Sequence, residues 1–397
     1  MIKNASRRSF HIQLLDIGME WEYGRDIILG ARHYAFATGR ITLGNGTLKR
    51  GMNLADAVQG RRIDGIIARV RDRTLEQRLL RLPVPCVNIS NVMPSTRLPL
   101  VTQDDEAAGR LAAEHLLACG CATFACWGQR NARFSRERIE GFRHALHGRM
   151  PWAKCVVGEG PSLLAEEGAP LIARMRAWLG KLPRRIGIFS VLDPFALHLI
   201  RAAREIGRDV PEDIAIIGAG DDEFWVDFEN VPLSSVKLPS RQIGYEAAAL
   251  LHKLMDGRGP PPSARRAPDE LHLPVTAVSA RRSTDVLFVE DEAVARAVAF
   301  IRERAAENVY VEDVARASGI SRSGLKVRFK QALGRPILSE IQRVRIARVQ
   351  YFLRTTDMKL TAIAEACDFP SSPRLNVLFR QTTGQTPGEY RAMFRHE

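Results

Sequence analysis

The sequence lacks the features that mark membrane proteins and secreted proteins. No apolar run reaches the roughly 18 residues that a membrane-spanning helix requires. The stretch from Met1 to Phe10 is polar and basic, and the apolar segment of a signal peptide does not follow it. We therefore expect a cytoplasmic protein that does not bind membranes.

Cysteine is scarce, and its spacing follows no metal-binding pattern. The chain has six cysteines in 397 residues, and none of them form a Cys-x-x-Cys pair. No histidine cluster lies near them in the sequence, which argues against a zinc site. In a chain of this length, isolated cysteines indicate free thiols in a reducing compartment. We expect no metal site.

The motifs of common enzymes are also missing. The sequence contains no Gly-x-Ser-x-Gly, Walker or His-Glu-x-x-His pattern. Two acidic pairs, Asp104–Asp105 and Asp221–Asp222, have the chemistry of acid–base catalysis. Their surroundings favour a role in capping helices and shaping loops instead. We expect no catalytic residue, no cofactor and no enzymatic activity.

Positive charge is abundant and unevenly distributed. The chain carries 58 Lys and Arg against 45 Asp and Glu, a formal net charge of +13. Residues Val314 to Glu397 hold 15 of the basic residues and only 6 of the acidic ones, so this short segment accounts for +9. A localised basic excess indicates a polyanionic partner, and double-stranded DNA is the one that we expect.

The first 285 residues alternate short apolar runs with segments of helical periodicity. The runs read as strands buried on both faces, which is typical of parallel sheets in α/β layers. They are Phe10–Leu15, Ile63–Ala68, Val84–Ile89, Thr123–Trp127, Ile186–Val191 and Ile214–Gly218. The helical segments are 24–37, 106–118, 136–146, 170–179 and 194–206.

The number of strands predicts two α/β lobes rather than one. Ligands of such proteins bind between the lobes, at the carboxyl ends of the strands. A late segment, Leu233–Val236 followed by the helix Arg241–Asp256, is expected to return the chain to the first lobe. A turn rich in proline and glycine, from Gly257 to Pro262, follows this helix.

Several motifs in this half resemble the LacI-type sensor, which has the fold of type I periplasmic binding proteins. They are Ile63-Asp-Gly-Ile-Ile67, Val101-Thr-Gln-Asp-Asp-Glu-Ala-Ala-Gly109, His115-Leu-Leu-Ala-Cys-Gly120, Arg138-Ile-Glu-Gly-Phe142, Val210-Pro-Glu-Asp-Ile-Ala-Ile-Ile-Gly218 and Pro232-Leu-Ser-Ser-Val236. The resemblance implies a ligand-sensing domain over residues 1–285. The N-terminal DNA-binding helices usual in that family are not expected here.

The resemblance also implies ligand-binding residues. In that family an arginine at the position of Arg138 holds ligand hydroxyls, and a guanidinium has five donors suited to vicinal hydroxyls. An aspartate after a strand, here Asp193, accepts hydrogen bonds from the ligand. Its position before Pro194 equally fits a helix N-cap, and one residue can serve both roles.

One family position differs in this chain. The family has two acids after Ile217-Gly218, and the first faces the ligand; here Gly220 stands in its place, unless a one-residue shift lets Asp221 replace it. Trp127 and Trp225 fit either stacking on a sugar face or core packing. Tyr23 and Arg25 follow the first strand and fit either the edge of the ligand site or the cap of the first helix.

The last 112 residues, 286–397, are expected to form an all-α domain with two helix-turn-helix units. In the first unit Gly319 ends one helix and Ser321 caps the next. Leu325 and Phe329 point inward because they are one helical turn apart. The opposite face presents residues suited to bases and phosphates, namely Arg322, Ser323, Lys326 and Lys330.

The same pattern repeats 49 residues later, where Asp368 takes the place of Gly319 and tolerates the same left-handed turn. Leu375 and Phe379 repeat the inward pair. Candidate contacts to DNA are Ser372, Arg374, Asn376 and Arg380. The alternative is that these are ordinary helices with solvated basic faces. One such pattern is a weak signal, whereas two in tandem, each with its inward pair at matching positions, favour DNA binding.

A helix over Pro336–Thr355 is expected to connect the two units. Its apolar residues Ile337, Ile341, Val344 and Tyr351 are predicted to share one stripe, and a rigid connector would place both reading helices in successive major-groove turns. The closing segment Gly384-Gln-Thr-Pro-Gly-Glu-Tyr-Arg391 resembles the signature of the AraC/XylS family. Val377 replaces the basic residue usual in that family.

The combination of both halves, joined by Arg281-Arg-Ser-Thr-Asp285, resembles the xylose operon regulators within the AraC/XylS family. This resemblance implies a homodimer that senses a pentose, works with RNA polymerase at the nucleoid and activates genes of sugar use. The alternatives are a non-sugar ligand, a site without ligand, or a repressor.

Overall fold

The computed structural model describes residues 9–19, 21–46, 63–151, 153–162, 168–226, 231–257, 269–286, 291–304, 309–333, 335–383 and 385–394. The chain divides into two compact units, Met1–Val286 and Leu287–Glu397. No helix within these described ranges is long and apolar enough to cross a membrane. All six cysteines are free thiols, as their spacing predicted.

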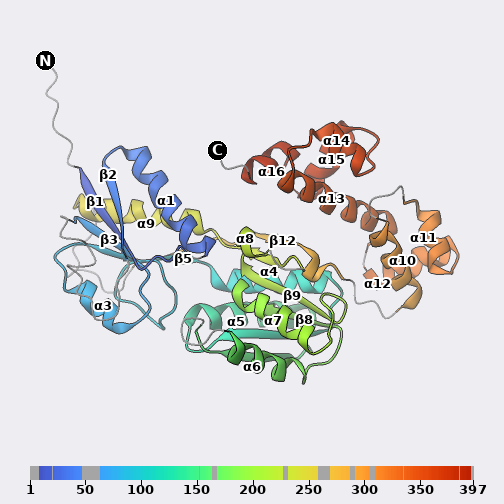
Figure 1. Ribbon diagram of the computed structural model, residues 1–397, viewed down its shortest axis with the longest axis horizontal. Coiled ribbons are helices and arrows are strands. Elements are labelled where there is room, and N and C mark those ends of the chain that lie inside the picture. Colours follow the sequence, from blue (N-terminus) through green and yellow to red (C-terminus); the bar gives the residue numbers. More distant parts are fainter. Residues whose placement is uncertain are drawn as a thin grey trace, which may run out of the picture. The chain divides into compact units, whose positions relative to one another are not determined.

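The first lobe of the N-terminal unit is built on a six-stranded sheet in which every pairing is parallel (Figure 1). Its strands, in spatial order, are β11 (Glu270–Leu273), β5 (Leu100–Gln103), β4 (Cys86–Asn88), β3 (Gly65–Ala68), β1 (Phe10–Leu15) and β2 (Ile41–Gly46). Its helices are α1 (Glu22–Thr38), α3 (Arg73–Leu80) and α9 (Ser240–Met255). Ile27 of α1 and Ile243 of α9 share one core with Ile12 of β1.

The second lobe repeats this layered plan. Its strands, in spatial order, are β12 (Ala277–Ser279), β10 (Ser234–Lys237), β9 (Ile214–Gly220), β8 (Ile186–Ser190), β6 (Thr123–Gln129) and β7 (Cys155–Gly160), and only β12 runs antiparallel. Its helices are α4 (Asp105–Ala118), α5 (Arg133–Arg149), α6 (Ala169–Leu179), α7 (Asp193–Glu205) and α8 (Glu223–Val226), and the 3-10 turn η2 spans Arg282–Thr284.

The return of the chain to the first lobe was predicted one element too early. Strand β10 stays in the second lobe because it pairs in parallel with β9. The helix that follows, α9, does belong to the first lobe, where Ala247 and Leu251 are fully buried. Beyond Gly257, the predicted turn from Gly257 to Pro262 lies outside the described residues.

The described part of the C-terminal unit is entirely helical, and its helices form two apolar cores. The helices are α10 (Glu292–Glu303), α11 (Val311–Ser318), α12 (Arg322–Leu333), α13 (Ile337–Thr355), α14 (Leu360–Ala366), α15 (Ser372–Thr383) and α16 (Pro387–Phe394). The first core contains Leu325 and Phe329, and the second contains Leu375 and Phe379, each of them fully buried. The two inward pairs predicted from the sequence are therefore confirmed.

Helix α13 belongs to both cores, and this corrects the predicted stripe. Ile337, Ile341 and Val344 lie in the first core as predicted, but the side chain of Tyr351 is 56% exposed. The second core instead receives Val349 and Leu353. At about 100° per residue, these side chains leave α13 on roughly the opposite side from Val344. The apolar stripe thus changes face halfway along the helix, because each end of α13 packs against a different helix-turn-helix unit.

Candidate effector site and nucleic-acid interface

Arg138 lies on α5, beside the point where the chain first passes from one lobe to the other. Its Nε donates to Oδ1 of Asp105 at 2.7 Å, and its Nη1 donates to the carbonyl oxygen of Val191 at 2.6 Å. Both charged side chains are almost completely buried. Burial of an ion pair is costly unless further hydrogen bonds support it. Arg138 is therefore held in one position at the boundary between the lobes.

The carboxylate of Asp105 also accepts hydrogen bonds from polar side chains of the first lobe. Nδ2 of Asn91 and Nε2 of Gln103 each donate to its carboxylate at 2.8 Å. The hydroxyl of Tyr23 lies 3.5 Å from Oε1 of Gln103, and burial raises the pKa of Tyr23 to about 12. Buried Oδ1 of Asn91 has no hydrogen-bond partner among the described residues. The lobe boundary therefore holds a dense set of donors and acceptors.

Sequence reasoning missed Asn91, Gln103 and Asp105 as site residues. Gln103 is the last residue of a buried strand and Asp105 follows it, which was a usable signal, but Asn91 lies in a loop without a motif. Of the acidic pair, Asp104 is the N-cap of α4 and accepts from the amide of Ala107 at 2.9 Å. The capping interpretation is thus confirmed for Asp104, whereas Asp105 turns inward to Arg138.

Asp193 does not cap α7, so that part of the prediction is wrong. The N-cap is Leu192, and the carboxylate of Asp193 instead accepts from the amide of Asp221 at 2.6 Å and from the hydroxyl of Ser235 at 2.6 Å. The carboxylate of Asp193 faces the loop after β9 because the buried amides of that loop and the buried hydroxyl of Ser235 need a hydrogen-bond acceptor. Burial raises the pKa of Asp193 to about 6.

Gly220, the position where the family acid is missing, provides space for Asp193. A Cβ atom on Gly220 would lie 2.8 Å from Oδ2 of Asp193, and one on Gly218 would lie 2.1 Å from Oδ1. Gly220 also has a φ of +146°, which side-chain-bearing residues rarely adopt. A carboxylate from α7 thus occupies the region that a side chain at position 220 would fill.

Asp221 faces the interior of the second lobe. Its carboxylate accepts from Nη1 of Arg281 at 2.7 Å and from the hydroxyl of Ser279 at 2.6 Å. Asp221 and Arg281 are both buried at the side chain, with 2% exposure each. Arg281 begins the Arg-Arg-Ser-Thr junction, and Ser283 there donates to the carbonyl oxygen of Ile216. The loop after β9 is therefore tied to the segment that leads to the C-terminal unit.

Asp222 makes contacts in the opposite direction, to the first lobe. Its Oδ2 accepts from the amide of Glu22 at 2.5 Å, and its Oδ1 forms an ion pair with Arg25 at 3.2 Å. Helix α1 begins after Trp21, whose side chain provides no cap. An aspartate at a helix N-terminus satisfies free amides and complements the helix dipole. The second lobe thus supplies the cap for the first helix of the first lobe.

The two tryptophans proposed for ligand stacking lie in different surroundings. Trp127 is 1% exposed and packs edge-on against Trp178 at 5.1 Å between ring centroids, which fits the core interpretation. Trp225 of α8 is half-buried, and its ring lies 5.5 Å from that of Trp21 across the lobe boundary. Trp225 therefore lies at the lobe boundary, whereas Trp127 packs inside the second lobe.

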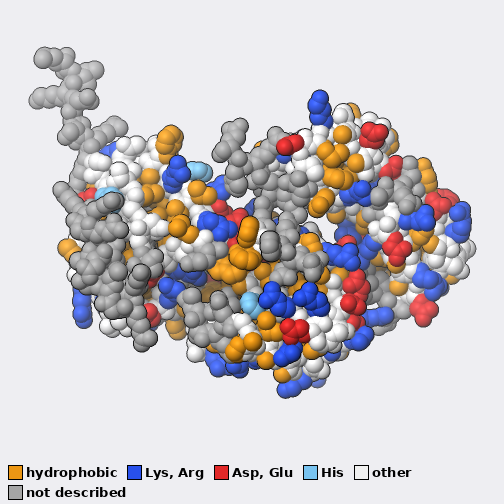
Figure 2. All heavy atoms as spheres, viewed as in Figure 1, with side chains coloured by type: hydrophobic (Ala, Val, Ile, Leu, Met, Phe, Trp, Pro, Cys, Tyr) orange, Lys and Arg blue, Asp and Glu red, His pale blue; other side chains and the backbone are white. Residues whose placement is uncertain are grey.

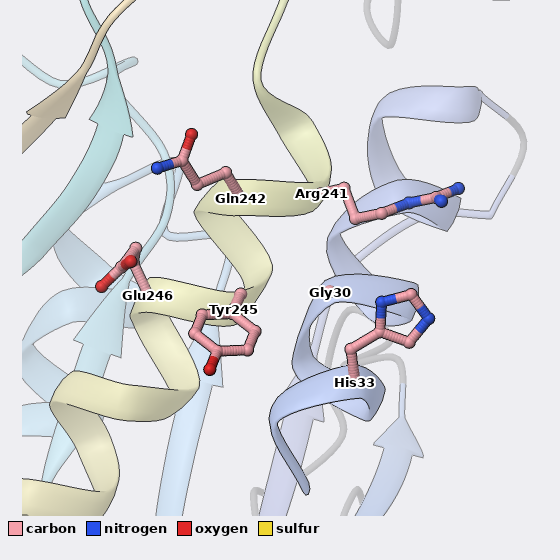
Figure 3. Close-up of a pocket in the computed structure, with 6 residues that line it drawn as sticks. All are labelled: Gly30, His33, Arg241, Gln242, Tyr245 and Glu246. Carbon is pink, nitrogen blue, oxygen red and sulfur yellow. The ribbon is translucent and has the colours of Figure 1, made fainter. Parts of the chain in front are cut away.

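A separate depression lies between α1 and α9 on the first lobe (Figure 3). It is lined by Gly30, His33, Arg241, Gln242, Tyr245 and Glu246. In Figure 3 the labelled residues come from two adjacent helices, and the side chain of Arg241 extends toward the helix that carries Gly30 and His33. None of the predicted ligand residues lines it, so this depression is distinct from the lobe boundary.

The first helix-turn-helix unit consists of α11 and α12. Gly319 ends α11 with a left-handed φ of +76°, and the hydroxyl of Ser321 accepts from the amide of Gly324 at 3.2 Å. In the second unit, Asp368 adopts a φ of +58° after α14, as predicted, and its carboxylate accepts from Arg345 at 3.0 Å. Ser371 caps α15 there, through a longer contact of 3.5 Å with the amide of Arg374.

The predicted DNA-contacting side chains all lie on the outer faces of α12 and α15. They are exposed at Arg322, Ser323, Lys326, Lys330, Arg374, Asn376 and Arg380, and half-buried at Ser372. Arg322 forms an ion pair with Glu312 at 2.6 Å. Figure 2 shows basic and acidic side chains interspersed on this unit in the view drawn. The structure therefore presents two similar polar helices on a common support, α13.

Comparisons with known proteins match both halves of the chain. A family of periplasmic binding proteins and the sugar binding domain of the LacI family matches residues 31–160, and a periplasmic binding protein-like domain matches residues 113–284. A helix-turn-helix domain matches residues 314–393. The fold class predicted from the sequence is confirmed.

Similar whole proteins share both halves in one chain. The xylose operon regulatory protein of Escherichia coli K12 is 32% identical over 335 residues, which cover 83% of each chain. That of Haemophilus influenzae is 29% identical and covers 85% of this chain and 87% of its own. The solved structure of a xylose-binding transcription activator is 28% identical, with a TM-score of 0.63 over 98% of this chain and all of that one.

Two α/β lobes joined in one chain to two helix-turn-helix units define a DNA-binding transcription regulator with a periplasmic-binding-protein-like sensor. The chain belongs to the family of xylose operon regulatory proteins. Its relatives are regulators and not enzymes, so the expectation of no enzymatic activity is confirmed by them.

Proposed function

We propose that residues 1–285 bind a pentose such as xylose between the two lobes and that residues 286–397 bind operator DNA in response. The observation that carries this proposal is the buried cluster of Arg138, Asp105, Asn91 and Gln103 at the lobe boundary. Sugar hydroxyls need fixed donors and acceptors of this kind. The relatives named for xylose regulation carry the same two halves.

The proposed sugar site combines predicted residues with those that the structure adds. Arg138 and Asp105 would bind hydroxyls, and Asn91 would use its unpartnered Oδ1 to accept from one. Trp225 and Trp21 would cover an apolar sugar face. The remaining candidates are Tyr23, Arg25, Asp193 and Asp221; the hydroxyl of Tyr23 lies beside Gln103, and Asp193 accepts from the amide of Asp221.

The loop after β9 is the route by which we propose that sugar binding affects the DNA-binding unit. Asp222 contacts α1 of the first lobe, and its neighbour Asp221 holds Arg281 at the start of the junction. A sugar that favours closed lobes would favour the Asp222 contacts. Because adjacent residues make both sets of contacts, the position of the junction would depend on closure.

The proposed DNA contacts are the exposed polar residues of α12 and α15. Arg322, Ser323, Lys326 and Lys330 would contact one major-groove turn, and Ser372, Arg374, Asn376 and Arg380 the next. We further propose that the protein acts in the cytoplasm, at the nucleoid, as a homodimer that recruits RNA polymerase and activates transcription. A dimer would place four reading helices on paired half-sites.

Titration calorimetry with D-xylose, D-ribose, L-arabinose and D-glucose tests the sensor, and a mobility-shift assay with and without the bound sugar tests the response. We expect D-xylose to bind and to change DNA affinity or complex geometry. Absence of heat with every sugar would refute the pentose proposal. Sugar binding without any change in the DNA complex would refute the coupling alone.

A further inference from the structure

The two reading helices carry a matched, exposed apolar side chain. The inward residues of α15 follow those of α12 by 50 positions, from Leu325 to Leu375 and from Phe329 to Phe379. The same offset pairs Val327 with Val377. Their side chains are 57% and 55% exposed. The match is therefore one of position, residue type and exposure.

The fold itself gives no reason for a valine at either position. Val327 stands two residues from both Leu325 and Phe329, so at about 100° per residue it points away from the core. Valine is a weaker helix former than most polar residues because its branched Cβ restricts rotation. Single exposed apolar residues are common on protein surfaces. Here, however, the same residue recurs where the flanking exposed positions differ, Lys326 against Asn376.

The chemistry of the major groove supplies a reason. Among the groups that base edges present there, the C5-methyl of thymine is the apolar one, and apolar side chains read it. Each valine lies sixth in its helix, among exposed polar and basic residues that fit bases and phosphates. We propose that Val327 and Val377 each pack against a thymine methyl group, at equivalent positions of the two segments that one chain reads. This inference rests on the proposed DNA-binding function.

Selection and base substitution test the proposal with the full chain. Double-stranded fragments that the protein retains from a random pool define its preferred sequence. In a selected fragment, each thymine is then replaced by deoxyuridine, which removes only the methyl group. We expect a loss of about fourfold in affinity at one thymine in each segment, the value for one buried methyl-sized group, and little change at the others.

Variants assign each methyl group to a helix. Val327→Ala is expected to abolish the sensitivity to deoxyuridine in one segment, and Val377→Ala in the other. Leu338→Ala is the matched control, because Leu338 is likewise an apolar side chain that is 55% exposed, but it belongs to α13 and not to a reading helix. We expect this control to bind as the wild-type chain does and to keep both sensitivities.

The possible failures are distinguishable. If both valine variants keep the wild-type deoxyuridine profile, or if no thymine is sensitive in a selected fragment, the thymine contact is refuted while DNA binding stands. If the full chain retains no fragment from the pool either with or without D-xylose, the DNA-binding function is refuted and the thymine contact with it.

Discussion

The two units of this regulator place their candidate functional residues in opposite environments. In the sensor, Arg138 and Asp193 are 2% and 1% exposed, and each is held by several hydrogen bonds. In the C-terminal unit, the candidates Lys326, Arg374 and Arg380 lie in solvent on the outer faces of helices. The cores beneath those helices are apolar.

The difference follows from what each unit must recognise. A small neutral ligand with many hydroxyls is bound by enclosing it, so the groups that bind it need fixed partners in the interior. A polyanion is larger than the domain and is met at the surface by charges that stay hydrated until contact. Substitutions in the sensor should therefore affect folding and function together, whereas those on the reading helices should affect function alone.

Arg138→Met should have the largest effect, because it leaves the buried carboxylate of Asp105 without its charged partner. Removal of one member of a buried ion pair costs roughly 3–5 kcal/mol. We expect thermal unfolding of the sensor at a markedly lower temperature, together with loss of sugar binding. Arg241→Met is the control, since Arg241 pairs with Asp26 on the surface with 41% exposure. Equal Tm values for the two variants would contradict the assigned burial of Arg138.

The sequence allowed the surface site to be predicted more completely than the interior one. Leu325 and Phe329, one helical turn apart, fixed which face of α12 is buried and therefore which residues are exposed. No comparable periodicity links Asp105 to Arg138 or Asp193 to Ser235, which are 33 and 42 positions apart and meet only after the second lobe has folded. The same reasoning explains the error at Tyr351, because one stripe was assumed where two cores compete for α13.

The raised pKa of Asp193 should make the stability of the sensor depend on pH. Burial raises its pKa from 3.8 to about 6, so between about pH 4 and pH 6 the folded chain keeps a proton that the unfolded chain releases. Stability should therefore fall as the pH rises through this window, by at most roughly 3 kcal/mol at 1.36 kcal/mol per pKa unit. Above pH 6 this contribution is constant.

Asp193→Asn provides the comparison for that prediction. Its amide group can accept from the amide of Asp221 and donate to the hydroxyl of Ser235, but it does not titrate. Denaturant unfolding of both proteins at pH 4.5, 5.5 and 7 measures the difference. A stability difference between them that stays constant with pH would exclude the raised pKa.

On the reading helices, Lys330→Ala and Arg380→Ala should each weaken DNA binding without a change in stability. The two residues lie 50 positions apart at equivalent exposed sites. A lost phosphate contact costs on the order of 1 kcal/mol of binding free energy. It also lowers the magnitude of the slope of log K against log salt concentration by about one. Binding measured at several salt concentrations gives the slope. A lower Tm in either variant would contradict the expectation that substitutions on the reading helices affect DNA binding alone.

The smallest expected effects compare the two helix caps of the C-terminal unit. Loss of a serine N-cap typically costs about 1 kcal/mol. The hydroxyl of Ser321 accepts from Gly324 at 3.2 Å, whereas that of Ser371 accepts from Arg374 at the limiting distance of 3.5 Å. Ser321→Ala should therefore lower the free energy of unfolding more than Ser371→Ala does, and neither should alter sugar affinity. Denaturant unfolding of the full chain, followed through the C-terminal transition, measures both. The turn before α15 is longer than the turn before α12, because Ser371 stands three positions beyond the left-handed residue Asp368 and Ser321 only two beyond Gly319. The opposite ranking would mean that this difference in turn length, and not the cap distance, determines how much each cap contributes to stability.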